Sequence, residues 1–165
     1  MENSHTKTLV ISSMIAALIF VVTFLVAIPV PGTSAYVNMG DSVIYCAGLL
    51  LNIPWAAAAA GVGSALADWA IGFPVYIPAT IIIKALMGLV CSAMMRNAKF
   101  PRFILACVTG GSIMFAGYFI YEVLFMGGWG YAVQTLIGNL IQWAGGVAGA
   151  IALYHPVKRI KGALI

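Results

Sequence analysis

Charged residues are the scarcest class in this sequence of 165 residues. Lys, Arg, Asp and Glu make up 7% of the chain, whereas 63% is hydrophobic; a soluble domain carries about 25% charged residues. Eight basic and four acidic side chains cannot cover the surface of a soluble fold of this length. The composition therefore excludes a soluble globular enzyme and indicates an integral membrane protein.

The sequence also lacks the motifs of common catalytic and metal sites. It contains no G-x-x-x-x-G-K phosphate loop and no H-E-x-x-H pair. His5 and His155 stand near the chain ends, and the three cysteines have no metal-ligand spacing. We therefore expect no enzymatic activity, no metal and no cofactor. No basic face is interleaved with aromatic residues, which excludes a nucleic-acid partner.

Continuous apolar runs divide the chain into six predicted membrane helices. A spanning helix needs roughly 20 mainly apolar residues, whereas a membrane β-barrel shows short segments of alternating polarity. We expect an all-α bundle of six transmembrane helices in a single integral membrane domain, and the second span is short for a full bilayer. The domain covers residues 1–165, and the spans are 8–28, 39–51, 54–71, 77–95, 103–125 and 131–154.

Seven of the eight basic residues fall on one side of this arrangement. They lie in the two termini and in the connector between the fourth and fifth spans. They are Lys7, Arg96, Lys99, Arg102, Lys158, Arg159 and Lys161. The loops on the other side contain none. Because short cytoplasmic loops are enriched in Lys and Arg, we expect both termini to be cytoplasmic.

The charges that remain within the spans all fall in the outer half of the bilayer. They are Asp41, Asp68, Lys84 and Glu122. Ionisable groups at this depth are costly and are usually paired or functional. We predict a structural ion pair of Lys84 with Asp68 or Asp41, beside a cavity that opens outward. One lysine against three carboxylates favours a neutral or cationic ligand over a polyanion.

Polar and aromatic residues of the last two spans extend the predicted cavity. Tyr118 and Glu122 share one helical face, and Asn139, Gln142 and Trp143 share another. Amides beside an indole suit a flat heteroaromatic ligand, although amides also join helices and tryptophans also line membrane interfaces. The candidate substrate-binding residues are Asn38, Tyr76, Lys84, Tyr118, Glu122, Trp129, Asn139, Gln142 and Trp143.

Small residues spaced four apart occur at the cytoplasmic end of the first span. The pairs are Ser12 with Ala16 and Ser13 with Ala17. Such pairs let two helix backbones approach closely. They serve either internal packing or the docking of a partner membrane protein.

Segments between residues 38 and 88 resemble the substrate-binding S components of energy-coupling factor (ECF) vitamin transporters, especially the riboflavin-type branch. The segments are Asn38-Met39-Gly40-Asp41, Ala65-Leu66-Ala67-Asp68, 72–80 and 82–88. The resemblance implies a subunit of a prokaryotic plasma membrane that binds one vitamin with high affinity in an outward-facing cavity. It also implies a transmembrane T component and two cytoplasmic ATPase subunits as partners. A small-residue pair of the first span would contact the T component.

The identity of the vitamin stays open at this point. The excess of carboxylates favours hydroxymethylpyrimidine, pyridoxine or thiamine. Riboflavin follows from the branch resemblance, and pantothenate, an anion, fits the charges less well. A stand-alone secondary carrier or channel for a small solute is the alternative function.

Overall fold

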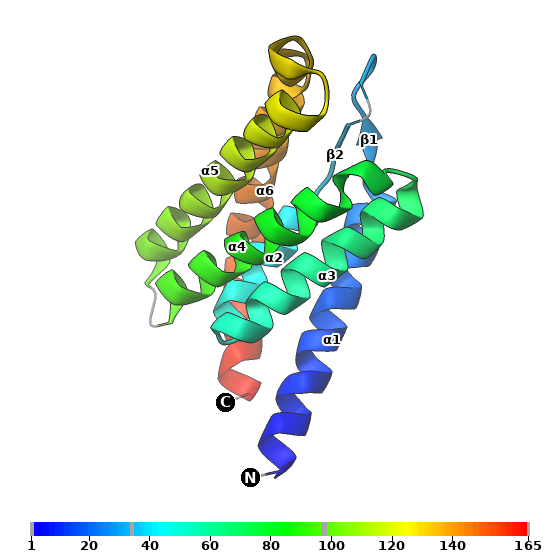
Figure 1. The fold of residues 1–165 in the computed structure, drawn as a ribbon. Coiled ribbons are helices and arrows are strands. Elements are labelled where there is room, and N and C mark those ends of the chain that lie inside the picture. The colour runs from blue at the N-terminus through cyan, green and yellow to red at the C-terminus, as the bar shows by residue number, and fades with distance from the viewer. Residues whose placement is uncertain (1, 34, 97–98, 165) are drawn as a thin grey trace.

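Helices account for most of the chain in the computed structural model, which describes residues 2–33, 35–96 and 99–164. Within these ranges there are six α-helices, a two-stranded hairpin and one 3-10 helix (Figure 1). The helices are α1 (Glu2–Leu25), α2 (Gly40–Leu50), α3 (Ile53–Ile71), α4 (Ile77–Met95), α5 (Phe100–Phe125) and α6 (Gly128–Leu164). The short elements are β1 (Ile28–Pro29), β2 (Tyr36–Val37) and η1 (Pro74–Tyr76). The expected all-α fold is confirmed.

Four helical segments of the described chain are long and apolar enough to cross a membrane. They are His5–Leu25, Pro74–Met95, Phe100–Phe125 and Gly128–Gly162. Their outer faces carry large apolar side chains such as Ile82, Leu124 and Ile137, which are between 67% and 69% exposed. Apolar exposure of this extent is costly in water and is expected against lipid.

The short helix α2 occupies the centre of the bundle. All residues from Gly40 to Leu49 are buried, and α2 contacts each of the other five helices. A helix surrounded by protein does not have to match the thickness of the bilayer. The central position of α2 therefore explains why the predicted second span can be shorter than the bilayer is thick.

Several helix ends differ from the predicted span ends. α1 ends at Leu25 because residues 28–29 pair with residues 36–37 in an antiparallel hairpin. α6 continues through Pro156, where a proline was expected to end it. The aromatic ring of Tyr154 packs against Phe100 and Phe103 and holds this part of α6 against α5.

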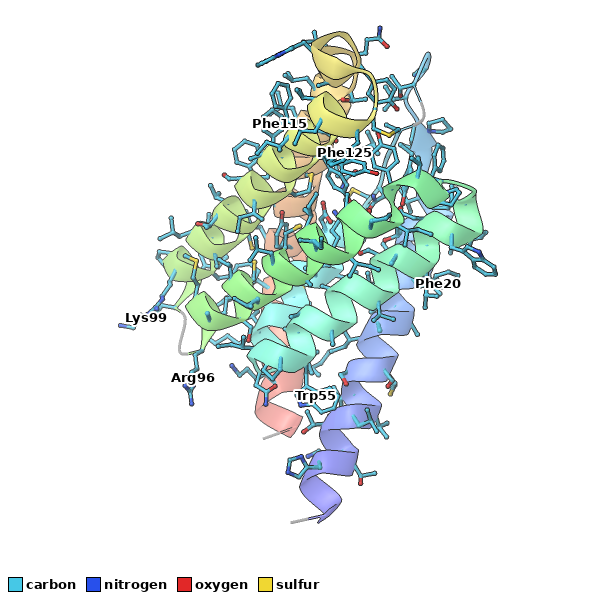
Figure 2. The ribbon with its side chains drawn as sticks, in the orientation of Figure 1. Phe20, Trp55, Arg96, Lys99, Phe115 and Phe125 are labelled. Atoms are coloured by element: carbon cyan, nitrogen blue, oxygen red, sulfur yellow. The ribbon has the colours of Figure 1, made fainter. Side chains whose placement is uncertain are left out.

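The two ends of the bundle differ in what they carry. Both termini lie in the lower part of Figure 1, whereas the hairpin and the turn between α5 and α6 lie in the upper part. Arg96 and Lys99 also lie toward the lower end (Figure 2). The described parts of the basic connector and the chain ends thus lie away from the hairpin, and the cytoplasmic orientation stays a prediction.

A glycine ends α3 at the point where the chain turns toward α4. Gly72 has φ +94, a left-handed conformation that favours glycine, and its N–H donates to the carbonyls of Asp68 and Trp69. η1 follows at once and leads into α4, which has a proline in its first turn. This turn places Asp68 and Tyr76 close to the upper end of the bundle.

Candidate functional site

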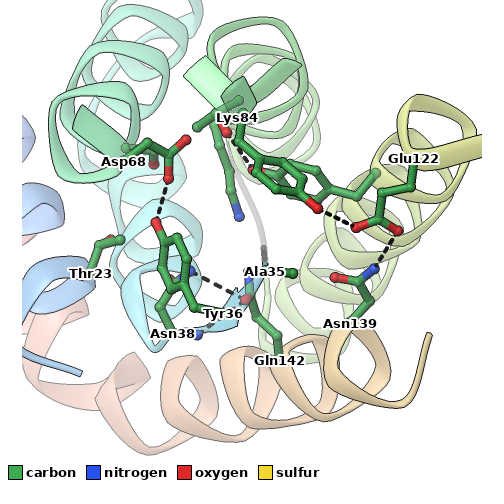
Figure 3. A pocket seen from close by; sticks show the side chains of 13 residues that line it. Thr23, Ala35, Tyr36, Asn38, Asp68, Lys84, Glu122, Asn139 and Gln142 are labelled. Atoms are coloured by element: carbon green, nitrogen blue, oxygen red, sulfur yellow. Dashed lines mark hydrogen bonds between the residues drawn. The ribbon is translucent and has the colours of Figure 1, made fainter. Parts of the chain in front are cut away.

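A pocket lies inside the bundle, bordered by the second strand of the hairpin (Figure 3). The empty space between its lining residues amounts to about 420 Å³, part of which is open to solvent. Side chains from α1, α3, α4, α5 and α6 reach it. The lining residues are Thr23, Ala35, Tyr36, Asn38, Ser64, Asp68, Tyr76, Thr80, Lys84, Tyr118, Glu122, Asn139 and Gln142.

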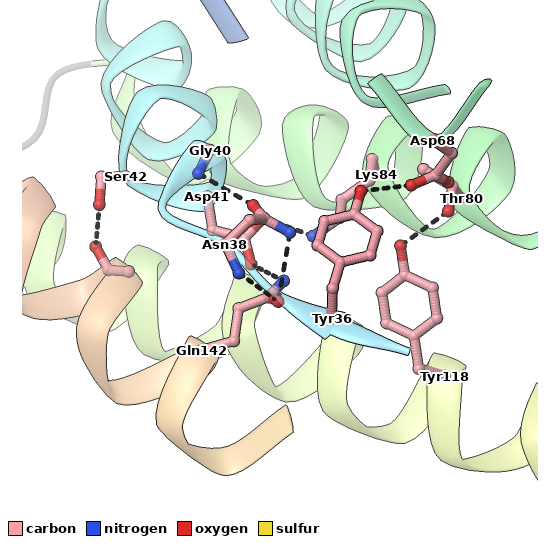
Figure 4. Close-up of polar contacts among 11 residues, drawn as sticks. Tyr36, Asn38, Gly40, Asp41, Ser42, Asp68, Thr80, Lys84, Tyr118 and Gln142 are labelled. Carbon is pink, nitrogen blue, oxygen red and sulfur yellow. Dashed lines mark hydrogen bonds and ion pairs between the residues drawn. The ribbon is translucent and has the colours of Figure 1, made fainter. Parts of the chain in front are cut away.

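A buried ion pair lies beside this pocket, and its lysine is one of the lining residues. Lys84 Nζ of α4 pairs with Asp41 Oδ1 of α2, and both side chains are almost completely buried. Gln142 Nε2 of α6 donates to the second oxygen of the same carboxylate at 2.9 Å. The Asn38 backbone N–H and side-chain amide both donate to Gln142 Oε1, at 3.1 and 3.2 Å. Gln142 thus bonds the pair directly, and Asn38 in turn holds Gln142 (Figure 4).

Glu122 is held by neutral donors on one side of the pocket. Its Oε1 accepts a hydrogen bond from the Tyr76 hydroxyl at 3.1 Å, and its Oε2 accepts one from Thr135 at 2.6 Å. Asn139 Nδ2 lies 3.4 Å from the same Oε2. Glu122 is 1% exposed. This carboxylate thus faces the pocket without a charged partner within hydrogen-bond reach among the described residues.

Asp68 lies on the other side of the pocket, next to the hairpin. Its Oδ1 accepts a hydrogen bond from the hydroxyl of Tyr36 on β2. Burial, followed by the nearby Asp68 charge, raises the pKa of Tyr36 well above its ordinary range, so that the phenol stays a donor. Tyr36 also packs against Phe73, with ring centroids 5.2 Å apart. These contacts fix the hairpin to the turn after α3.

Tyr118 and Thr80 complete the wall between the two carboxylates. Their hydroxyls lie 2.9 Å apart, at hydrogen-bond distance. The ammonium group of Lys84 lies 5.4 Å from the centre of the Tyr118 ring, within the range of a cation–π contact. The wall is thus polar at its hydroxyls and aromatic over its surface.

The structure brings seven of the nine candidate binding residues to the pocket. These are Asn38, Tyr76, Lys84, Tyr118, Glu122, Asn139 and Gln142. Trp129 is not among them: it is 69% exposed and packs edge-to-face on Phe119. Trp143 is also outside the lining; its ring packs on Phe115 and against Gly111.

The ion pair involves one of the two acids considered. Lys84 pairs with Asp41, while Asp68 bonds to Tyr36 and lines the pocket. Asp41 lies in the buried first turn of α2, where the Gly40 N–H donates to Asn38 Oδ1 at 2.9 Å. The Asp41 side chain is 0% exposed, so the ion pair is shielded from solvent.

Some lining residues were not singled out from the sequence. They are Thr23, Ala35, Tyr36, Ser64 and Thr80. Three of them, Thr23, Ser64 and Thr80, are hydroxyl residues within apolar helices, and this feature of the sequence could have indicated them. The hairpin residues gave no signal, because their position depends on pairing with a distant segment.

The two small-residue pairs of α1 face different environments. Ser12 is buried, its hydroxyl donates to the Leu9 carbonyl at 2.9 Å, and the Ala16 backbone lies against Gly63 of α3. Ser13 and Ala17 are exposed. Internal packing therefore uses the first pair, and the second pair remains on the outer surface.

The fold and the pocket define a class: a multi-pass membrane protein with a polar pocket inside its helical bundle. The sequence model described as "ECF-type riboflavin transporter, S component" matches residues 3–159. The chain belongs to this family of ECF S components, which are substrate-binding subunits of vitamin transporters and not enzymes. The family assignment predicted from residues 38–88 is thus confirmed.

Two relatives align with most of the chain. A thiamine precursor transporter, HmpT, of Lactococcus lactis is 31% identical over 160 residues, which cover 96% of this chain and 92% of the relative. An uncharacterized protein of Pyrococcus woesei is 32% identical over 146 residues, which cover 88% of this chain and 97% of the relative.

Proposed function

We propose that this S component takes up a thiamine precursor of the hydroxymethylpyrimidine type, bound in the pocket beneath the hairpin. One observation carries the proposal: Lys84, the cation of the pocket lining, is engaged by Asp41, whereas Glu122 and Asp68 have neutral donors around them. A ligand that brings hydrogen-bond donors complements such a pocket, and an anionic vitamin does not.

The sequence relationships support the same ligand class. HmpT is a thiamine precursor transporter and aligns along nearly its whole length with this chain. Pyridoxine carries a ring nitrogen and hydroxymethyl groups, and thiamine contains the aminopyrimidine ring, so both compounds belong to the same test. Riboflavin is the second candidate, because the family model bears its name.

Isothermal titration with the purified chain tests the proposal. Hydroxymethylpyrimidine, pyridoxine, thiamine, riboflavin and pantothenate are titrated separately into the same preparation. We expect the pyrimidine to bind most tightly and pantothenate not to bind. Tightest binding of riboflavin would replace the proposed ligand, and tightest binding of pantothenate would overturn the argument from charge.

We further propose the family's partner set for this chain: a transmembrane T component and two cytoplasmic ATPase subunits. The exposed Ser13 and Ala17 support a helix contact with the T component on this face of α1. Uptake into liposomes is then expected only when all partner subunits and ATP are present. Ion-driven uptake by the chain alone would support a secondary carrier instead.

A further inference from the structure

One carboxylate oxygen in the pocket has no hydrogen-bond donor. Asp68 is 3% exposed. Tyr36 donates to its Oδ1, while its Oδ2 is buried and has no hydrogen-bond partner among the described residues. A buried carboxylate oxygen without a donor is unfavourable. Its position in the pocket lining means that a bound ligand can supply the missing donor.

The neighbouring polar groups are already engaged with other residues. The ammonium group of Lys84 pairs with Asp41. Thr80 interacts with Asp68, and its hydroxyl lies at hydrogen-bond distance from Tyr118. None of the described side chains thus donates a hydrogen bond to Asp68 Oδ2.

A hydroxyl group without a hydrogen-bond partner among the described residues lies on the same side of the pocket as Asp68. Thr23 of α1 is 2% exposed, lines the pocket, and its Oγ1 has no partner among the described residues. Figure 3 shows Thr23 and Asp68 on one side, across the pocket from Glu122 and Asn139. The pocket thus has two polar ends, and each contains one carboxylate.

We propose that Asp68 is a substrate-anchoring residue, whose Oδ2 accepts a hydrogen bond from an O–H or N–H group of the ligand, with Thr23 beside it as a second contact. This inference rests on the proposed function, since it assigns a second end to the same pocket. Glu122 then binds a different donor of the ligand. The pocket then selects a flat ring that carries two hydrogen-bond donors, as an aminopyrimidine with a hydroxymethyl group does.

A cycle of variants and ligands tests the assignment. Asp68→Asn keeps the shape of the side chain. Only one oxygen is then left to accept hydrogen bonds, and the Tyr36 hydroxyl and the ligand compete for it. Three ligands are titrated: hydroxymethylpyrimidine, an analogue with methyl in place of hydroxymethyl, and an analogue without the exocyclic amine. Tyr36→Phe is the matched control, because it removes the hairpin's hydrogen bond to Asp68 and leaves Oδ2 unchanged.

We expect Asp68→Asn to weaken binding of the parent pyrimidine by about ten- to hundredfold, the range of a hydrogen bond to a charged group. The loss should vanish for one of the two analogues, and the loss caused by Glu122→Gln should vanish for the other. Tyr36→Phe should affect all three ligands equally. Thr23→Val removes a hydroxyl and no charge. It should weaken binding of the same ligands as Asp68→Asn, but by a smaller factor, and it replaces Asp68→Asn in the test if that variant does not fold.

Other results would overturn the assignment. An equal loss for all three ligands in Asp68→Asn would mean that Asp68 acts only through Tyr36 and the hairpin. Unchanged affinity in a folded Asp68→Asn protein would mean that Asp68 does not contact the ligand. If the wild-type chain binds none of the three compounds, the proposed function fails, and the inference fails with it.

Discussion

Lys84 of α4 pairs with Asp41 of α2 in the buried centre of the bundle, and Gln142 of α6 donates to the second oxygen of the same carboxylate. Three helices therefore meet at one pair of charges. Because the cation is used in this contact, the two other carboxylates of the pocket determine which ligands it favours. The stability of the fold and the selectivity of the site are linked at this point.

Removing one partner of the ion pair should destabilise the fold, because the other charge would stay buried and unpaired. Lys84→Met leaves a buried carboxylate without its counter-charge, which destabilises by about 3–5 kcal/mol. The double variant with Asp41→Asn should recover a large part of this loss. Thermal unfolding in detergent measures the effect, with the exposed Lys99→Met as the control. A double variant as unstable as Lys84→Met alone would contradict this account.

Glu122 should contribute to binding more than to folding. Glu122→Gln keeps the size of the side chain and two acceptor or donor atoms, but it removes the charge that faces the pocket. We expect ligand affinity to fall by about ten- to hundredfold with a small change in melting temperature. Trp129→Phe is the control and should leave affinity unchanged, because Trp129 lies outside the pocket. A Trp129→Phe protein that loses affinity would return this residue to the binding site.

The packing of α3 against α4 depends on a glycine. A Cβ atom on Gly88 would lie 2.5 Å from the Ala56 carbonyl oxygen, which belongs to the backbone of α3. Gly88→Ala should therefore force the two helices apart and destabilise by about 1–3 kcal/mol. Gly130→Ala, which has no atom within 4 Å of the new Cβ, is the matched control in thermal unfolding. Equal melting temperatures of the two variants would show that the contact is looser than described.

Partner assembly should be separable from ligand binding. Ser13→Leu enlarges the exposed small-residue pair of α1 and should abolish co-purification with the T component and ATPase subunits. Ligand affinity should not change, because Ser13 does not line the pocket. Ser112→Leu, an equally sized change on the exposed face of α5, is the control and should leave the complex intact. Loss of the complex in both variants would mean that the effect is not specific to α1.

Helical spacing explains why part of the site could be predicted. Tyr118 and Glu122 on α5, and Asn139 and Gln142 on α6, share faces by their separation along the chain, and all four line the pocket. The same spacing does not determine how a large ring turns. Trp143 packs on Phe115 of α5 and so leaves the pocket.

Contacts between distant segments could not be predicted from spacing. The bond between Tyr36 and Asp68 joins a hairpin to the end of α3, and it depends on the pairing of residues 28–29 with 36–37. The burial of Asp41 similarly depends on α2 lying among five other helices. The sequence indicated the chemical groups of the site, whereas the packing determines which of them remain available to a ligand.

Native mass spectrometry tests the central claim most directly. The purified chain is incubated with equal concentrations of hydroxymethylpyrimidine, riboflavin and pantothenate, and the masses retained by the folded protein are recorded. We predict retention of one pyrimidine molecule per chain, reduced in Glu122→Gln and in Asp68→Asn. Retention of pantothenate in preference to the pyrimidine, with the two carboxylate variants unaffected, would contradict the account.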